Sequence, residues 1–157
     1  MGNRRLSREL ALQFLYQYDV LEEADGEKLS LESSIRGFWS GREPPIKGET
    51  MEFADMLVRG TCEHLDSIDS IIGDFSEHWR LQRMPKIDRN ILRMGIYELI
   101  HLSSIPPAVT INEAVDLAKK YGTEQSGGFV NGILDKVHLA LAAGEIKHDK
   151  GSDNQDN

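Results

Sequence analysis

Hydrophobic residues recur at three- and four-residue steps along most of the chain, and this period is typical of helices that bury one face. In the first such segment Leu10, Phe14 and Tyr18 lie about one turn apart. No segment alternates polar and apolar residues as a half-buried strand does. The sequence therefore predicts an all-α fold of about seven helices. The predicted helices cover residues 7–21, 29–39, 50–62, 64–75, 88–100, 110–121 and 126–143.

Glycine, proline and acidic residues separate these helices. Residues 22–28 are acidic and contain Gly26, so we expect a loop there. Residues 41–48 begin and end with glycine and hold two prolines, which predicts a second break. The segment 79–86 is predicted to be irregular around Pro85.

Three helix ends carry recognisable cap residues. Asp88 stands where an N-cap belongs, ahead of the most hydrophobic helix, which we expect at the centre of the fold. Gly95 on the buried face of that helix would let another helix come close. The Thr110-x-x-Glu113 spacing predicts a capping box. Gly122 is expected to end the helix in the left-handed conformation.

Length and composition bound the class of protein. The 157 residues fit one domain, predicted over residues 1–144, followed by a disordered acidic tail at 145–157 that has Ile146 as its only large apolar residue. The formal charge of -8 argues against a protein that coats nucleic acid by overall positive charge, although a local basic patch remains possible. Cys62 is the only cysteine, so no intrachain disulfide is possible, and we expect it to be buried.

No apolar run approaches the roughly 18 residues that a membrane span needs. The first ten residues also lack the apolar centre of a signal peptide. We therefore expect a cytoplasmic protein with no membrane association.

The residues that could carry chemistry do not assemble into a known catalytic pattern. The five histidines form no pair at helical metal-ligand spacing, so no metal site is predicted. Gly127–Gly128 lacks the lysine and hydroxyl residue of a phosphate-binding loop, so no nucleotide cofactor is predicted. No nucleophile, base and oxyanion site come together. The sequence predicts a binding protein and not an enzyme.

The N-terminus carries a cluster of basic residues, and a lone aromatic residue opens the last helix. Arg4 and Arg8 share one helix face and Arg5 lies beside them, which suits either phosphate binding or a charged, frayed end. Phe129 is either a core residue or a platform on which a base stacks. The preceding Gly127–Gly128 favours the second interpretation, because glycines leave the ring uncovered on one side.

A second basic cluster lies in the middle of the chain. Its last two members are one helical turn apart, so we expect part of it to form an exposed helix face. Structural capping and pairing with acidic residues is the alternative. The cluster consists of Arg80, Arg83, Lys86, Arg89 and Arg93.

Three long motifs resemble the NusB family of bacterial transcription antitermination factors. They are RRLSRELALQFLYQ at 4–17, HWRLQRMPKIDRNILRMGIYEL at 78–99, and VTINEAVDLAKKYG with SGGFVNGILDK at 109–136. The resemblance covers most of residues 4–140.

The resemblance implies two small helical bundles and a role in transcription. NusB-like proteins bind the boxA element of ribosomal RNA leader transcripts together with NusE, a small ribosomal subunit protein. The pair joins a complex that keeps RNA polymerase elongating through terminators. A homodimer that hides the RNA surface is also possible. The alternative function is a protein–protein adaptor or regulatory domain without direct RNA binding.

The resemblance also implies which residues do this work. On the RNA side it implies Arg4, Arg5, Arg8, Glu124, Gln125, Ser126 and Phe129. On the partner side it implies Tyr16, Glu77, Arg80 and Arg83. Two departures from the family favour RNA binding that depends on the partner. Leu6 interrupts an arginine run found in relatives, and Gly127–Gly128 replaces polar or basic residues.

Overall fold

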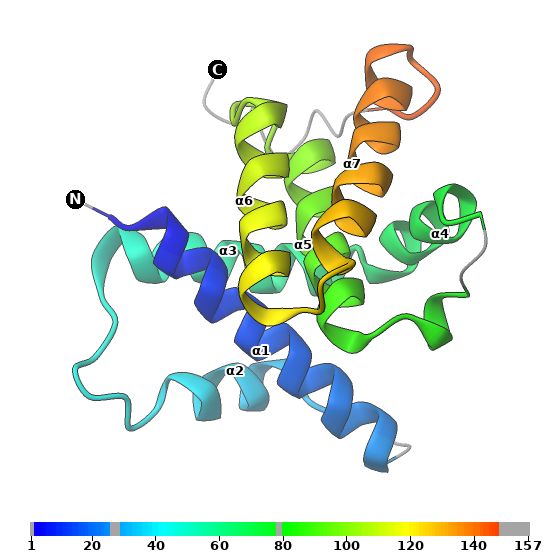
Figure 1. Cartoon of the computed structure of the whole chain (residues 1–157). Helices are drawn as coiled ribbons and strands as arrows, with labels where there is room; N and C mark the ends of the chain where they lie inside the picture. Colours follow the sequence, from blue (N-terminus) through cyan, green and yellow to red (C-terminus); the bar gives the residue numbers. More distant parts are fainter. Residues whose placement is uncertain (1, 26–28, 78–79, 148–157) are drawn as a thin grey trace. The chain divides into compact units, whose positions relative to one another are not determined.

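The computed structural model describes residues 2–25, 29–77 and 80–147. These residues form seven α-helices and one short 3-10 helix, and none of them lies in a strand (Figure 1). The predicted all-α fold of about seven helices is confirmed. In chain order the elements are α1 (Arg4–Asp25), α2 (Leu31–Trp39), α3 (Gly48–Glu63), α4 (Leu65–Phe75), η1 (Leu81–Arg83), α5 (Lys86–His101), α6 (Pro107–Tyr121) and α7 (Ser126–Ala142).

The chain divides into two compact units, Met1–Arg59 and Gly60–Asn157, and the boundary falls inside α3. The first unit holds α1, α2 and most of α3. Aromatic side chains join α1 to α2 in this unit: the Phe14 ring meets the Phe38 ring edge to face at 5.5 Å between centroids. Such edge contacts stabilise aromatic pairs beyond the area they bury.

Helix α1 is longer at both ends than the apolar pattern predicted. It starts at Arg4 because the Asn3 side chain accepts a hydrogen bond from the Leu6 amide at 2.9 Å, which caps the helix. It continues to Asp25, so the predicted loop at residues 22–28 is wrong for its first four residues. The remaining three lie outside the described residues.

The break between α2 and α3 is confirmed. Helix α2 is capped by Ser30, whose hydroxyl accepts from the Ser33 amide at 3.3 Å. Beyond α2, Gly41 and Gly48 have φ angles of 77° and 63°. Side chains rarely tolerate this left-handed backbone, so glycine at these two positions allows the chain to turn.

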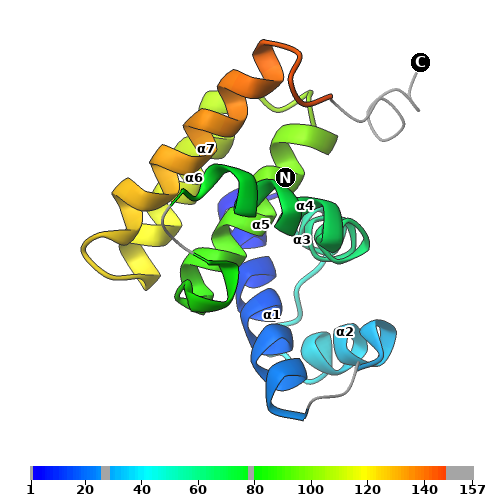
Figure 2. The same ribbon diagram turned by 90° about the vertical axis from the view of Figure 1, so that its right-hand side faces the viewer.

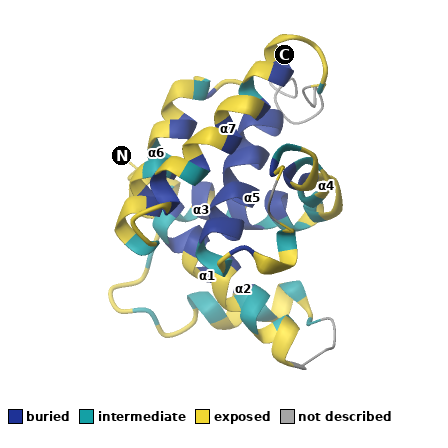
Figure 3. Ribbon diagram, turned by 45° about the vertical axis from the view of Figure 1, so that its right-hand side comes forward, coloured by how far each residue is buried: buried dark blue, intermediate teal, exposed yellow. Residues whose placement is uncertain are grey.

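Helix α5 forms the centre of the second unit, as predicted. All of its residues from Asp88 to His101 are buried, and the helix contacts α4, α6 and α7 (Figures 2 and 3). Gly95 permits the close approach of α7, since a Cβ atom there would lie 3.0 Å from Leu134 Cδ1. Gly60 has the same role for the Tyr97 ring, which occupies the place a side chain would take.

The predicted caps in the second unit are wrong. Helix α5 begins at Lys86, directly after Pro85, so Asp88 lies within the first turn. Helix α6 begins at Pro107, which places Thr110 inside the helix, where its hydroxyl donates to the Glu98 carboxylate at 3.1 Å. An early proline can start a helix because its missing amide proton is not needed there.

Three further expectations need correction or stay open. Gly122 has an extended backbone with φ −97°, not a left-handed one. Cys62 is half-buried and not buried. Most of the predicted tail, residues 148–157, lies outside the described residues, so its disorder stays a prediction. Among the helices that the structure describes, none combines the length and apolar character needed to cross a bilayer.

Candidate functional site

The N-terminal arginines lie against an aromatic ring of α3. The guanidinium carbons of Arg4 and Arg8 stand 4.5 Å and 5.3 Å from the centroid of the Phe53 ring, within the range of cation–π attraction. The prediction that these two share one helix face is therefore confirmed. Arg4 and Arg5 are exposed, but Arg8 is only 4% exposed. Arg8 therefore lies buried against the Phe53 ring, and its predicted RNA contact stays a prediction.

Hydrogen bonds fix the start of α1 to the start of α3. The amides of Gly2 and Asn3 donate to the side chains of Glu49 and Thr50, each at 2.9 Å. The Ser7 hydroxyl donates to the Thr50 carbonyl oxygen at 2.7 Å. The terminus is thus held in place and not frayed, so Arg4 and Arg5 are presented from an ordered helix end.

A second candidate region is the turn between α6 and α7. Glu124 and Gln125 are exposed there, but Ser126 is buried. The Ser126 hydroxyl donates to the Asp88 carboxylate at 2.7 Å and accepts from the Thr123 amide at 2.9 Å. The Ser126 hydroxyl thus points into the protein in this structure, and the predicted role of Ser126 in RNA binding stays a prediction. Ser126 anchors the turn that carries the other two.

The same contact has an electrostatic consequence at the start of α5. Burial raises the pKa of the Asp88 carboxyl above its usual value, and the hydrogen bond from Ser126 partly opposes this shift. Gly122 completes the turn, because a Cβ atom there would lie 2.4 Å from Ser126 Oγ. A glycine is needed at position 122 because of this close approach and not because of an unusual φ angle.

Phe129 lies in the first turn of α7. It is half-buried, so it is not one of the fully buried core residues. It lines a shallow groove of about 250 Å³ that lies between α7 and the end of α4. Gly128 and Gly132 lie on the α7 side of the groove, and Phe75 and Glu77 on the other side.

The predicted partner-binding residues are all exposed. Tyr16 is 39% exposed and, with Leu21 and Phe38 of the same unit, lines a shallow apolar groove on α1 and α2. Glu77, Arg80 and Arg83 belong to the second unit and are also exposed. No contact of the structure tests their predicted role.

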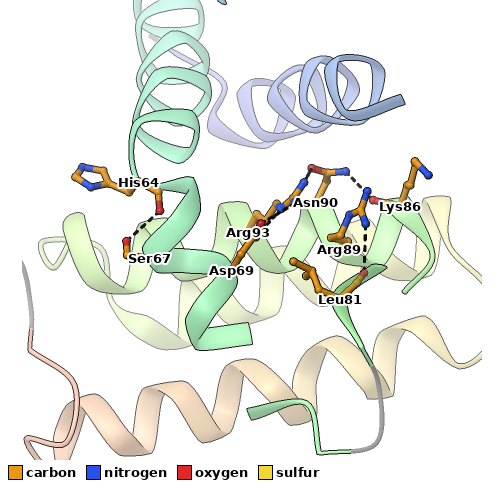
Figure 4. Close-up of polar contacts among 8 residues, drawn as sticks. All are labelled: His64, Ser67, Asp69, Leu81, Lys86, Arg89, Asn90 and Arg93. Carbon is orange, nitrogen blue, oxygen red and sulfur yellow. Dashed lines mark hydrogen bonds and ion pairs between the residues drawn. The ribbon is translucent and has the colours of Figure 1, made fainter. Parts of the chain in front are cut away.

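The end of the second basic cluster is structural. Arg93 donates from Nε and Nη2 to the two carboxylate oxygens of Asp69, both at 2.8 Å, and from Nη1 to Asn90 Oδ1 at 3.2 Å (Figure 4). Arg89 donates to the Leu81 carbonyl oxygen at 3.2 Å. Both arginines are buried. The expected exposed face is wrong for them, and the pairing alternative is the one that the structure shows.

The sequence did not indicate the residues that hold the N-terminal arginines. Phe53 fitted the apolar stripe of its helix, and nothing in the pattern near it pointed to arginines more than forty positions away. Asn3 at the start of a helix was the one local signal, because asparagine is a favoured N-cap residue.

Among the described residues, no group of three or more potential ligands could hold a metal ion. His78 and His148 lie outside them.

These features describe an all-helical protein: its first unit carries exposed arginines at the start of α1, and its second unit carries a polar turn and a groove lined by an aromatic ring. The sequence matches the model of the NusB family over residues 5–139. A transcription antitermination protein NusB from Trichlorobacter lovleyi is 50% identical over 137 residues, which are 87% of this chain and 91% of the relative.

Solved structures agree with the sequence comparison. A structure of T. maritima NusB is 38% identical with a TM-score of 0.76, covering 88% of this chain and 93% of that one. A complex of the antitermination factors NusB and NusE with dsRNA contains a chain that is 33% identical, with a TM-score of 0.73 and coverage of 87% and 96%. The chain belongs to the NusB family.

Proposed function

We propose that this protein is a transcription antitermination factor that binds boxA-type RNA of ribosomal RNA leader transcripts together with NusE. Membership of the NusB family over almost the whole described chain carries this proposal. The protein acts in the cytoplasm, within the complex that keeps RNA polymerase elongating, and it acts by binding and not by catalysis.

Arg4 and Arg5 contact the RNA phosphates in this proposal. Both residues are exposed, and the contacts to Glu49 and Thr50 hold their helix end in place, so less conformational entropy is lost on binding. Arg8 belongs to the site through Phe53, because it lies against the same ring as Arg4.

The second unit supplies contacts to the bases. Phe129 stacks on one base, and Glu124 and Gln125 reach the RNA from the exposed turn. Ser126 contributes by fixing that turn to Asp88. A base stacked on an aromatic ring contributes on the order of 1–3 kcal/mol.

The charge balance explains the need for a partner. Two exposed phosphate-binding arginines on a protein of net charge -8 give weak RNA binding alone, since the remaining surface repels phosphate. NusE adds RNA contacts, and it contacts Tyr16 in the first unit and Glu77, Arg80 and Arg83 in the second. In its absence a homodimer is a further possible state.

A salt titration tests the phosphate contacts. We would measure the fluorescence anisotropy of a labelled single-stranded boxA RNA with NusE present, over a range of salt concentrations. The double variant Arg4→Gln/Arg5→Gln should reduce the slope of log K against log[salt] by roughly 1.4, or about 0.7 per contact. Arg36→Gln removes an exposed arginine of α2 and should leave the slope unchanged. An equal slope for wild type and the double variant would remove these residues from the RNA site.

The same assay separates antitermination from the adaptor function. With boxA RNA, wild type and NusE should bind each other more tightly than with a scrambled RNA of equal length. An adaptor would bind NusE equally well with either RNA or with none. A duplex RNA of the same sequence tells whether the single strand is the preferred ligand.

A further inference from the structure

One face of α3 holds the residues at which α1 begins. Phe53 is three residues after Thr50 and four after Glu49, so these three side chains share that face, here called the α3 platform. The Gly2 amide donates to the Glu49 carboxylate at 2.9 Å, and a Cβ atom at Gly2 would lie only 2.6 Å from Glu49 Cβ. The Asn3 amide donates to the Thr50 hydroxyl at 2.9 Å. The backbone ahead of α1 is thus fixed to the platform.

The third residue of the platform, Phe53, contacts arginine side chains. Its ring centroid lies 4.5 Å from the guanidinium carbon of Arg4 and 5.3 Å from that of Arg8. Arg4 is exposed, whereas Arg8 is buried, so Arg4 is the more accessible of the two cations at the ring. An aromatic ring has no oxygen acceptor, and the contact therefore commits none of the N–H donors of Arg4 to an oxygen.

Such a ring favours arginine over lysine at position 4. A guanidinium group is planar and weakly hydrated, so it can lie against a ring and still offer parallel N–H groups to a phosphate. An ammonium group is a compact and strongly hydrated charge that gains less from the ring. A long exposed side chain also loses rotamer freedom when it binds a ligand. A ring that already holds the guanidinium group reduces this loss.

We propose that Phe53 is a positioning residue for RNA binding. Its ring holds the Arg4 guanidinium group where it contacts a phosphate, and it makes this contact specific for arginine. The inference rests on the proposed function and deepens it, because it identifies a residue that raises RNA affinity without touching the RNA. Phe53 itself is only 5% exposed. The competing role for Phe53 is packing alone, as a member of the apolar face of α3.

Arg4→Lys tests the positioning because it keeps the charge. With NusE present, this variant should weaken the binding of labelled boxA RNA about five-fold, which lies within the range of one cation–π contact. The slope of log K against log[salt] should not change, since the number of cations at the site stays the same. The Tm should not change measurably, because Arg4 is exposed.

A double-mutant cycle tells whether the ring and the guanidinium group act together. Phe53→Leu keeps an apolar side chain on α3 but removes the ring, and it should weaken boxA binding about five-fold. In the Phe53→Leu background, Arg4→Lys should weaken binding by less than about two-fold, because no ring is left to favour arginine.

Phe14→Leu is the matched control for the loss of a buried ring. Phe14 belongs to α1 in the same unit and is 3% exposed. This variant should lower the Tm about as much as Phe53→Leu does, and it should leave the affinity for boxA RNA unchanged.

Four results would overturn the inference. If Arg4→Lys binds boxA RNA as tightly as wild type, the ring does not select arginine. If the two losses multiply to about 25-fold in the double variant, the ring and the guanidinium group act independently. If Phe14→Leu weakens binding as much as Phe53→Leu, the ring acts only through the stability of the first unit. If wild type with NusE binds boxA RNA no better than scrambled RNA, the proposed function itself fails, and the positioning role fails with it.

Discussion

Breaking the ion pair between α4 and α5 should be one of the more destabilising single changes in the second unit. Arg93 is 9% exposed and Asp69 22% exposed at the side chain, and two hydrogen bonds of 2.8 Å join them. The variant Asp69→Ala would leave a buried guanidinium without its carboxylate. Removing one member of a buried pair costs about 3–5 kcal/mol, and the partial exposure of Asp69 favours the lower end.

This loss is large enough to measure by thermal and urea unfolding. A cost of about 3 kcal/mol corresponds to a fall in Tm of roughly 6–12 °C for a chain of this length. Asp74→Ala is the control, because Asp74 is an exposed acidic residue of the same helix. It should change the free energy of unfolding by less than about 0.5 kcal/mol.

A double-mutant cycle distinguishes the pair from the packing around it. The cycle consists of the single variants Asp69→Leu and Arg93→Met and the double variant Asp69→Leu/Arg93→Met. The double variant replaces both charges with apolar groups and should recover much of the stability that Asp69→Leu loses, because neither charge of the pair is left without its partner. The coupling energy should exceed about 1 kcal/mol. A cost below about 1 kcal/mol for Asp69→Ala would mean that the pair behaves like a surface salt bridge, and the burial argument would be refuted.

Two further predictions concern the RNA surface and the α6–α7 turn. Phe129→Ala should weaken boxA binding about ten-fold in the anisotropy assay while the Tm changes little; a loss of about 3–5 kcal/mol in stability would instead show a core residue. Asp88→Asn should become increasingly stabilising, relative to wild type, as pH rises. Because the pKa of Asp88 is raised in the folded protein, the protonated carboxyl stabilises the fold. This stabilisation is fully present below the unfolded pKa of about 3.9 and is lost as pH rises through the folded pKa. Thermal unfolding of both proteins from pH 4 upward measures this, and a difference independent of pH would contradict it.

The helices could be predicted from sequence because helical periodicity is a local property. Residues three and four apart share a face whatever the rest of the chain does, so the apolar stripes of α5 and α7 identify both helices and the central place of α5. The three long motifs also sufficed to indicate the family. Helix ends were less certain, as the early starts of α5 and α6 at Lys86 and Pro107 show.

The tertiary structure decided which polar residues face solvent. In the sequence, Arg8 and Arg93 look no different from the exposed Arg4. Both are buried, because Phe53 of another helix packs on Arg8 and Asp69 of another helix pairs with Arg93. Ser126 likewise turns inward because Asp88 lies opposite its hydroxyl. A charged or hydroxyl side chain is stable inside a protein only when a partner satisfies it. That partner can be dozens of residues away in sequence, so local patterns do not reveal it.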